Sequence, residues 1–293
     1  MRSGISEIVH IIPFGHEFDR AIRPFDTAAA NHVYIITDSG KTDEGTENVA
    51  PQRDYVSRVI KYLKKKHIPA DVIETDFSDM SELLKTISSL IRREQFFGNK
   101  VYVNMSAAGE LGAAAATLAG MALNAEVYCV HTDRYASDAE RAATGVSVCR
   151  TNSVSMLPKV DIHLPDDSEL PVLEELYYSE NNVLSASEIS EVVEDESESG
   201  DAADYCLKKC DFSFVSSMCE GMPVPSIVSE AESDTERWER RKVQSRNLMK
   251  VSGMMKRMEE KGYVTKGKFG RKMMYQLTER GMYALILSGY VDH

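Results

Sequence analysis

The chain has 293 residues, a length that suits two ordinary domains. Its composition, 43% hydrophobic and 27% charged, is typical of a globular protein and argues against a wholly disordered chain. No apolar run approaches the roughly 20 residues that span a bilayer, and five cysteines without a secretory context indicate free thiols. We therefore expect a cytoplasmic protein without a membrane partner.

The net charge of −12 is distributed unevenly along the chain. Residues 194–236 hold twelve acidic side chains against two lysines, whereas residues 237–280 hold fourteen Lys and Arg against four Glu. The first segment is predicted to be an acidic insertion that begins with a flexible loop, because it is poor in apolar residues. The second has a local positive charge that attracts phosphates. Because salt screens the attraction between charges beyond roughly 8 Å, the charge of this segment rather than that of the whole chain decides whether it binds phosphates.

Strand-like and helix-like segments alternate over residues 1–165. The apolar periodicity predicts helices at 51–66, 80–97 and 110–123, and β-rich runs at 5–12, 32–37, 70–77, 100–106, 125–132 and 160–165. This alternation predicts an α/β fold, a Rossmann-like doubly wound domain with a mostly parallel sheet.

Residues 166–293 are predicted to form a second domain that binds DNA. A linker is expected from Pro165 to Pro171 and a helix from Val172 to Tyr178, and Ser185 with Glu188 has a helix N-cap pattern. Residues 248–258 carry apolar side chains at helical spacing, and Gly262 is expected to end that helix. Two strands follow around the basic turn GKFGRK, and residues 277–290 then predict a closing helix.

This helix, the turn Glu259-Glu260-Lys261-Gly262 and the basic hairpin resemble the winged helix-turn-helix of bacterial and archaeal regulators of the multiple-antibiotic-resistance type. The resemblance implies a recognition helix in the major groove and hairpin cations on phosphates of double-stranded DNA. The preceding helix is either residues 185–193, with the acidic insertion interrupting the motif, or residues 234–244. The expected DNA contacts are Arg246, Lys250, Ser252, Lys256, Arg257, Lys266, Lys268, Arg271 and Lys272.

Two loops at the carboxyl ends of predicted strands are candidates for a ligand site. They are residues 13–20, PFGHEFDR, and residues 104–110, NMSAAGE. Ligands of doubly wound sheets bind at this edge, and the exposed amides of a following helix suit phosphate. The chain lacks both the G-x-G-x-x-G fingerprint and a P-loop, so NAD or ATP is not expected as a cofactor.

The two loops and the order of the domains resemble archaeal regulators that couple a CARF domain, the CRISPR-associated Rossmann fold, to a winged helix. Residues 8–25, 101–119 and 241–264 carry this resemblance. It implies a homodimer with one symmetric pocket for a cyclic oligoadenylate, cyclic tetra-adenylate first among them. The implied ligand-binding residues are Phe14, Gly15, His16, Arg20, Thr37, Asp38, Asn104, Ser106, Ala107 and Gly109.

One departure from that family bears on the ligand. Members often have a Gly-Gly pair and a basic residue after the Asn-x-Ser/Thr, where this chain has Ala107, Ala108, Gly109 and Glu110. A carboxylate that faces a phosphate repels it. A different nucleotide, or no ligand, therefore stays open beside cyclic tetra-adenylate.

Other roles for the chemistry-bearing residues are also open. His16 and Arg20 could do acid–base work on a phosphodiester, as in a ring nuclease, but a loop that only binds is preferred and no catalytic residue is assigned. The winged helix could dock a protein instead of DNA. Cys206, Cys210 and Cys219 lack a fourth ligand, so no metal is expected. His10 is expected to be a core residue. We predict a ligand-responsive transcription regulator rather than an enzyme.

Overall fold

The computed structural model describes residues 6–40, 46–149, 154–160, 162–198, 249, 251–270, 272–289 and 291. Its contacts divide the chain into two compact units, Met1–Leu164 with Ile286–Val291, and Pro165–Leu285. Several predictions lie outside the described residues: the contacts Arg246, Lys250 and Arg271, the helix at 234–244, the acidic insertion beyond Glu198, and the three clustered cysteines. Within the described ranges, no helix is both long enough and apolar enough to cross a membrane.

The first unit is built around a six-stranded sheet in the order β3-β2-β1-β4-β5-β8. Five strands are parallel, namely β1 (Ile8–Pro13), β2 (His32–Asp38), β3 (Ala70–Thr75), β4 (Lys100–Asn104) and β5 (Glu126–Val130). The edge strand β8 (Val154–Met156) pairs antiparallel with β5. The predicted mixed α/β fold with a mostly parallel sheet is therefore confirmed.

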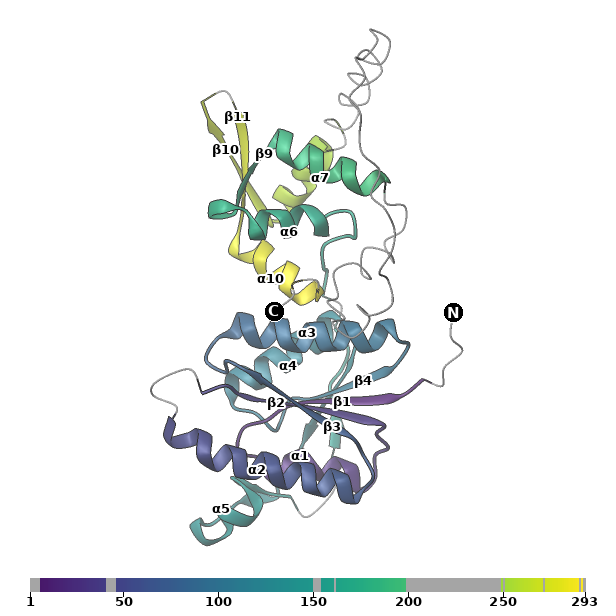
Figure 1. Cartoon of the computed structure of the whole chain (residues 1–293), viewed down its shortest axis with the longest axis vertical. Helices are drawn as coiled ribbons and strands as arrows, with labels where there is room; N and C mark the ends of the chain where they lie inside the picture. The colour runs from purple at the N-terminus through teal and green to yellow at the C-terminus, as the bar shows by residue number, and fades with distance from the viewer. Residues whose placement is uncertain are drawn as a thin grey trace, which may run out of the picture. The chain divides into compact units, whose positions relative to one another are not determined.

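Helices cover both faces of this sheet (Figure 1). One face carries α1 (Phe18–Ile22), continued by a 3-10 turn at Arg23–Asp26, and α2 (Thr46–Lys65). The other face carries α3 (Met80–Phe96) and α4 (Glu110–Ala122). Strands covered on both faces have no solvent side, which explains why β1 and β2 are apolar almost throughout.

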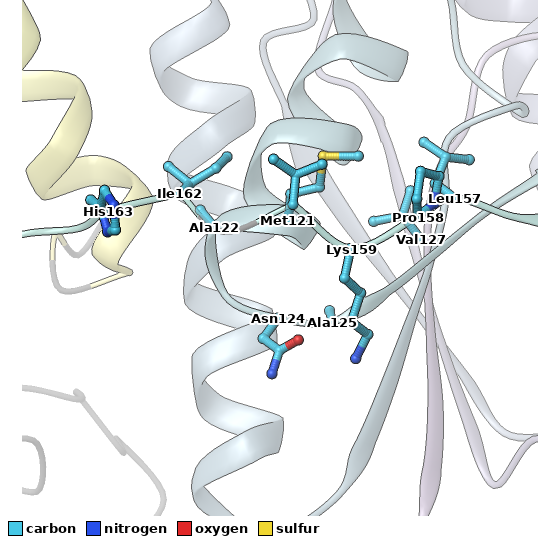
Figure 2. Close-up of a pocket in the computed structure, with 11 residues that line it drawn as sticks. Met121, Ala122, Asn124, Ala125, Val127, Leu157, Pro158, Lys159, Ile162 and His163 are labelled. Carbon is cyan, nitrogen blue, oxygen red and sulfur yellow. The ribbon is translucent and has the colours of Figure 1, made fainter.

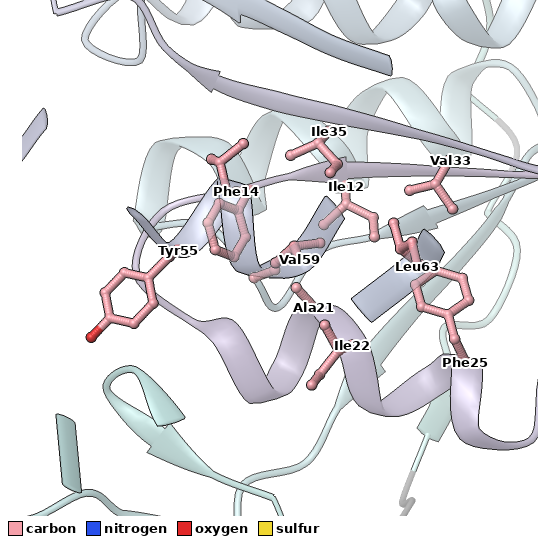
Figure 3. Packing of buried hydrophobic residues seen from close by; sticks show 12 residues of the cluster. Ile12, Phe14, Ala21, Ile22, Phe25, Val33, Ile35, Tyr55, Val59 and Leu63 are labelled. Atoms are coloured by element: carbon pink, nitrogen blue, oxygen red, sulfur yellow. The ribbon is translucent and has the colours of Figure 1, made fainter. Parts of the chain in front are cut away.

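The core between the sheet and α1 and α2 is a continuous apolar cluster (Figure 3). Ile12 and Ile35 of the strands face Ala21, Val59 and Leu63 of the helices. Because these side chains are fully or almost fully buried, they fix how α1 and α2 lie on the sheet.

The other face has a closer contact, which explains the alanine-rich sequence of α4. A Cβ added at Gly120 would lie 2.3 Å from Cγ2 of Val127 in β5. Ala115, Ala116 and Ala119 are fully buried on the same helix. Small side chains are thus what allow α4 to approach the sheet so closely.

The prediction of a last strand at residues 160–165 is wrong. The described residues 157–160 and 162–165 form no strand, and Val154–Met156 pair with β5 instead. Pro158 and Pro165 have no N–H to donate to a ladder, which disfavours a strand there. The periodicity also missed β6 (Arg134–Tyr135), α5 (Asp138–Thr144) and β7 (Ser147–Val148), three elements that follow β5.

The second unit combines helices with a three-stranded antiparallel sheet of order β10-β11-β9. Its elements are α6 (Leu170–Tyr178), a 3-10 turn at Glu180–Asn182, β9 (Val183–Ser185), α7 (Ala186–Glu198), a helix over residues 251–260, β10 (Val264–Phe269), β11 (Lys272–Leu277) and α10 (Glu279–Ser288) up to Leu285. The predicted hairpin and the helix that follows it are confirmed. The pairing of β9 with β11 was not predicted.

Two predicted boundaries in this unit are wrong, and one cap is confirmed. The linker ends earlier, because α6 begins at Leu170 and Pro171 suits the first helical turn. Residues 194–198, predicted as a loop, are the last residues of α7. The Ser185–Glu188 cap exists: the Ser185 N–H donates to Glu188 Oε2 over 2.6 Å, and the Glu188 N–H to Ser185 Oγ over 3.4 Å.

The helix over residues 251–260 ends as predicted at Gly262, which has a φ of +75°. The Tyr263 N–H donates to the Met258 carbonyl over 2.8 Å, and the Gly262 N–H donates to the Glu259 carbonyl over 2.9 Å. These two bonds are those of a Schellman cap, in which glycine adopts the left-handed conformation without a Cβ penalty.

An ion pair joins this helix end to the start of α6. Lys261 Nζ lies 2.8 Å from Glu169 Oε2 and 3.2 Å from Asp166 Oδ2. Burial lowers the pKa of Lys261, but the hydrogen bonds to Glu169 and Asp166 outweigh it, so the pKa is raised. Because Glu169 is fully buried, Lys261 is the cation that neutralises it.

Removing that cation should destabilise the second unit. Lys261→Met leaves the Glu169 carboxylate buried without its partner, so we expect the free energy of unfolding to fall by about 1–3 kcal/mol. Lys256→Met is the matched control, because Lys256 is exposed and 3.8 Å from the exposed Glu260; it should change stability by less than about 0.5 kcal/mol. Urea denaturation measures both, and equal stabilities would contradict the role given to Lys261.

Candidate functional site

The carboxyl ends of β1 and β4 lie side by side in the middle of the sheet. From β1 the chain winds outward through β2 to β3, and from β4 it winds the other way to β5. This is the topological switch point, where ligands of doubly wound sheets bind. The two loops singled out from the sequence therefore meet, and the Gly15 N–H donates to the Ala107 carbonyl over 2.9 Å.

Asn104, the last residue of β4, organises the second loop from inside. Its side chain is fully buried, and its Oδ1 accepts from the Ser106 N–H over 2.9 Å and from the Ser106 hydroxyl over 2.6 Å. Its Nδ2 donates to the Arg20 carbonyl over 3.1 Å. The Ser106 Oγ in turn accepts from the Val130 N–H over 2.9 Å. One amide thus ties the loop after β4 to α1 and, through Ser106, to β5.

Arg20 spans the same three segments with its guanidinium group. Its Nη1 donates to the Ser106 carbonyl over 3.2 Å, and its Nε donates to the Thr132 hydroxyl over 2.7 Å. The side chain remains 23% exposed, so a ligand at the strand ends can reach it. Arg20 is consequently both a brace for the loops and a positive charge at the site.

An aromatic layer backs the Asn104 network on the side away from solvent. His10 Nδ1 lies 3.1 Å from the Tyr128 hydroxyl oxygen, and the His10 ring stacks on Tyr102 with centroids 5.0 Å apart. Burial lowers the pKa of His10 to about 4 and raises that of Tyr128, so both are neutral at pH 7. His10 is therefore a core residue, as expected.

The ten predicted ligand residues separate into two groups by burial. Five have side chains buried inside the unit and can offer a ligand little but backbone atoms: Phe14, Thr37, Asn104, Ser106 and Ala107. Phe14 in particular belongs to the apolar cluster (Figure 3). Five others keep accessible surface: Gly15, His16, Arg20, Asp38 and Gly109.

Asp38 is directed toward the loop that follows β3. Its Oδ1 accepts from the Gly40 N–H over 3.3 Å and from the Phe77 N–H over 3.4 Å. It lies at the end of β2, one strand farther from β4 than the first loop. The structure thus brings the loops after β1 and β4 together and leaves Asp38 at their border.

Residues 146–149, which include β7, are the part of the site that sequence reasoning missed. The Val146 N–H donates to the His16 carbonyl over 3.2 Å, the Ser147 hydroxyl to Glu17 Oε1 over 3.0 Å, and the Cys149 N–H to Asp19 Oδ2 over 3.1 Å. Burial, with the neighbouring Asp19, raises the pKa of Cys149 to about 11. Strands of two residues are too short to show an apolar periodicity. The Ser137–Glu140 capping box at the start of α5 is the sequence feature that could have predicted a helix just before these residues.

The charges around the site are mixed. Glu17 Oε1 lies 3.9 Å from Arg20 Nη1, and Glu17 Oε2 is buried without a hydrogen-bond partner among the described residues. Glu110 is exposed in the first turn of α4. His131 is engaged by the Ser155 hydroxyl, 2.7 Å from its Nε2, and Arg134 is paired with Glu140. Arg20 is therefore the best-placed cation for an anionic ligand.

A separate cavity of about 320 Å³ lies elsewhere in the first unit. It is lined by the end of α4, the start of β5 and the chain after β8, including Met121, Asn124, Val127 and Lys159 (Figure 2). The amino end of β5 is at the opposite edge of the sheet from the switch point, so this cavity is not the predicted site. No group of three His, Cys, Asp or Glu within the described ranges is placed to hold a metal ion.

Comparison with known proteins gives relatives for the first unit. Residues 8–135 match the family described as "HFX_2341_N:-like, N-terminal". The uncharacterized protein MJ1513 of Methanocaldococcus jannaschii is 28% identical over 120 residues, which are 40% of this chain and 34% of that protein. The match thus spans about a third of that relative's length.

Three solved structures are distantly similar. VC1899 from Vibrio cholerae gives a TM-score of 0.39 at 12% identity, covering 96% of this chain and 64% of that one. Enterococcus italicus Csm6 bound to cyclic hexa-2'-fluoro-hexa-dAMP gives 0.36 at 8%, covering 70% and 54%. Can2 from Sulfobacillus thermosulfidooxidans in complex with cyclic tetra-adenylate gives 0.35 at 8%, covering 97% and 64%. Because each TM-score is below 0.5, no ligand or activity of this chain follows from them.

The Asn104 network predicts a measurable contribution to stability. Asn104→Ala leaves the buried Ser106 N–H without its acceptor, so the free energy of unfolding should fall by about 1–3 kcal/mol. Ser57→Ala is the control, since Ser57 is exposed on α2 and its hydroxyl bonds only within its own helix; we expect a change within about 0.5 kcal/mol. Denaturation followed by circular dichroism tests this, and an Asn104→Ala protein as stable as the control would refute the assignment.

Proposed function

We propose that this chain is a homodimeric, ligand-responsive transcription regulator, with a CARF-type sensor in its first unit and a DNA-binding winged helix in its second. The observation that carries the proposal is the helix over residues 251–260 with its hairpin, which together present exposed cations. Local positive charge on a helix and an adjoining hairpin is the electrostatic footprint of a nucleic-acid-binding surface.

The helix over residues 251–260 has one buried and one exposed face. Val251, Met254, Met255 and Met258 are buried and fix the helix on its unit. Ser252, Lys256 and Arg257 are exposed. A helix with an apolar face held inside and a polar face open to solvent can enter the major groove without losing its packing.

The hairpin supplies the wing of the proposed motif. β9 pairs with β11, and α7 begins directly after β9. Of the two candidates for the helix that precedes the recognition helix, α7 is therefore the one that lies within the described residues. Lys266, Lys268 and Lys272 are exposed on the hairpin. Lys266 Nζ lies 2.7 Å from Glu259 Oε2, so Lys268 and Lys272 are the stronger candidates for phosphate contacts.

The DNA proposal predicts a loss of affinity that depends on salt. Lys268→Gln with Lys272→Gln removes two hairpin charges, so affinity for duplex DNA from the protein's own upstream region should fall at low salt. The slope of log K against log salt should become shallower by about 2, about 1 for each contact. Fluorescence polarisation across a salt series measures both quantities. Lys64→Gln with Lys65→Gln, two exposed lysines at the end of α2, is the matched control and should bind as wild type.

Two results would contradict this prediction. Absence of binding at every salt concentration would overturn DNA binding. If the hairpin variant keeps the wild-type affinity and salt slope, the hairpin does not contact phosphates, and docking of a partner protein becomes the better explanation of the second unit.

The switch point supports the sensor half of the proposal. The Gly109 N-cap places no side chain over the first turn of α4, so the amides of Glu110 and Leu111 are available to a phosphate. Arg20 adds a charge-assisted donor beside them. We propose a cyclic oligoadenylate, with cyclic tetra-adenylate as the first probe, although Glu110 opposes an anion at this position.

An exposed apolar stripe on α4 supports the homodimer. Leu111 and Leu118 are 43% and 40% exposed, and Ala114 lies between them on the same helical face. The stripe begins at Leu111, whose amide is one of those proposed to bind phosphate. If two copies pair along α4, their two sites adjoin, and one symmetric ligand can touch both.

Charges in this stripe should therefore separate the protomers. Leu111→Asp with Leu118→Asp places two carboxylates in the proposed interface, so sedimentation should show a monomer, with weaker binding of cyclic tetra-adenylate. Phe96→Asp is the control, because Phe96 is 49% exposed at the far end of α3. A stripe variant that stays dimeric would rule out α4 as the interface.

Ligand response is read from the same DNA titration with and without cyclic tetra-adenylate. A shift in affinity supports the sensor. DNA binding that ignores the nucleotide keeps the regulator and discards this ligand. Hydrolysis of the cyclic tetra-adenylate, lost in His16→Ala, would replace the sensor with a ring nuclease.

A further inference from the structure

Tyr135 is the most exposed large hydrophobic residue among the first unit's described residues, with 74% of its surface accessible. It lies on β6, three residues after Thr132, which binds the Arg20 guanidinium. An aromatic ring held in water beside a ligand site gains stability when a flat apolar partner covers it.

The strand that carries Tyr135 is fixed to the first loop of the site. The Ala136 N–H donates to the Val146 carbonyl over 2.9 Å, and the Val146 N–H donates to the His16 carbonyl over 3.2 Å. The backbone next to Tyr135 is therefore linked to His16 by two successive hydrogen bonds through Val146. A Cβ at Gly145 would lie 2.2 Å from the His16 carbonyl oxygen, so the ribbon and the loop are in tight contact.

The register of the β6–β7 ribbon decides which way Tyr135 projects. Tyr135 is directly opposite Ser147, and opposite residues of an antiparallel pair have side chains on one face. The Ser147 hydroxyl donates to Glu17 Oε1 over 3.0 Å, so that face is turned toward the first loop. Ser147 is fully buried and Tyr135 is exposed, so the Tyr135 ring lies at the solvent end of that face.

The neighbouring Arg134 ties the ribbon to α5. Its guanidinium makes two hydrogen bonds to Glu140, over 2.7 and 2.5 Å, and Glu140 also closes the capping box of α5. The hydrogen bonds from Arg134 and Ser137 hold the pKa of the Glu140 carboxyl well below its usual range, so this pair stays charged at neutral pH. Tyr135 is thus carried on a braced strand rather than on a free loop.

We propose that Tyr135 is the base-stacking residue of the site, and that it selects ligands with a purine base. This inference rests on the proposed sensor function. Phosphates near Arg20 and the start of α4 would leave a base to extend outward toward the Tyr135 ring. Stacking on an aromatic side chain needs only the flat face of a base, and an adenine offers a larger face than a pyrimidine.

Calorimetric titration of the full-length protein tests this with cyclic tetra-adenylate and cyclic tetra-uridylate as probes. Tyr135→Ala should weaken binding of cyclic tetra-adenylate about 5- to 150-fold, the equivalent of roughly 1–3 kcal/mol for one lost stacking contact. Tyr135→Phe keeps the ring and should bind as wild type. Tyr178→Ala, which removes a 58% exposed tyrosine from the second unit, is the matched control.

The ratio between the two probes separates stacking from a general loss of structure. Wild type should prefer the adenylate ring, and Tyr135→Ala should reduce that preference while its circular dichroism spectrum stays unchanged. Wild-type affinity and preference in Tyr135→Ala would overturn the inference and leave the sensor proposal standing. If the wild-type protein binds neither probe, the sensor proposal fails, and the stacking role fails with it.

Discussion

The buried amide of Asn104 is the contact on which the rest of the site depends. A polar side chain without solvent access must satisfy its hydrogen bonds internally, and Asn104 does so with Ser106 and the Arg20 carbonyl. Parallel strands are held by their ladder only as far as it runs, and the ladder between β4 and β5 ends at Asn104. Beyond that residue a few backbone hydrogen bonds remain, from the Met105 N–H to the Tyr128 carbonyl and from the Gly15 N–H to the Ala107 carbonyl, and side chains supply the other contacts. Asn104 therefore fixes the position of the loop after β4 relative to α1 and, through Ser106, relative to β5.

The electrostatics of the site limit what it can bind. Arg20 is braced by Ser106 and Thr132, so its charge stays at the strand ends without the entropy cost of ordering a free side chain. Glu17 and Glu110 lie at the same edge and weaken its attraction for phosphates. A ligand of this site would need neutral contacts as well, from backbone amides and from a surface such as the Tyr135 ring. Apolar and stacking contacts then matter more here than in a site lined with cations.

The second unit separates structural cations from exposed ones. Lys261 neutralises the buried Glu169, and Lys266 pairs with Glu259, so both are committed to contacts within the unit. Lys256, Arg257, Lys268 and Lys272 remain exposed on the helix and the hairpin. The same basic sequence therefore serves two purposes, and Lys266, which is exposed but paired, is a weaker candidate for phosphate contacts than Lys268 and Lys272.

Some helices, helix ends and caps depend only on residues that are close together in the sequence, and the sequence was sufficient to predict these. Apolar periodicity placed α3 and α4 within a residue or two, Gly262 marked a helix end that requires positive φ, and Ser185 with Glu188 marked a cap. The alternation of strands and helices predicted the parallel sheet, and with it the edge where the loops after β1 and β4 meet. These predictions succeed because hydrogen bonding and side-chain volume within a few residues decide them.

Contacts between distant residues required the tertiary structure. Residues 160–165 looked like a strand because they are partly apolar, yet the pairing edge of β5 is occupied by Val154–Met156. Phe14 looked like a ligand residue from its loop, but the core against α2 buries it. The ribbon that carries Tyr135 has strands of two residues, too short for any period. The sequence by itself thus determined the elements and the edge where a ligand would bind, whereas the tertiary structure decided which side chains reach that edge, because burial and strand pairing depend on the whole fold.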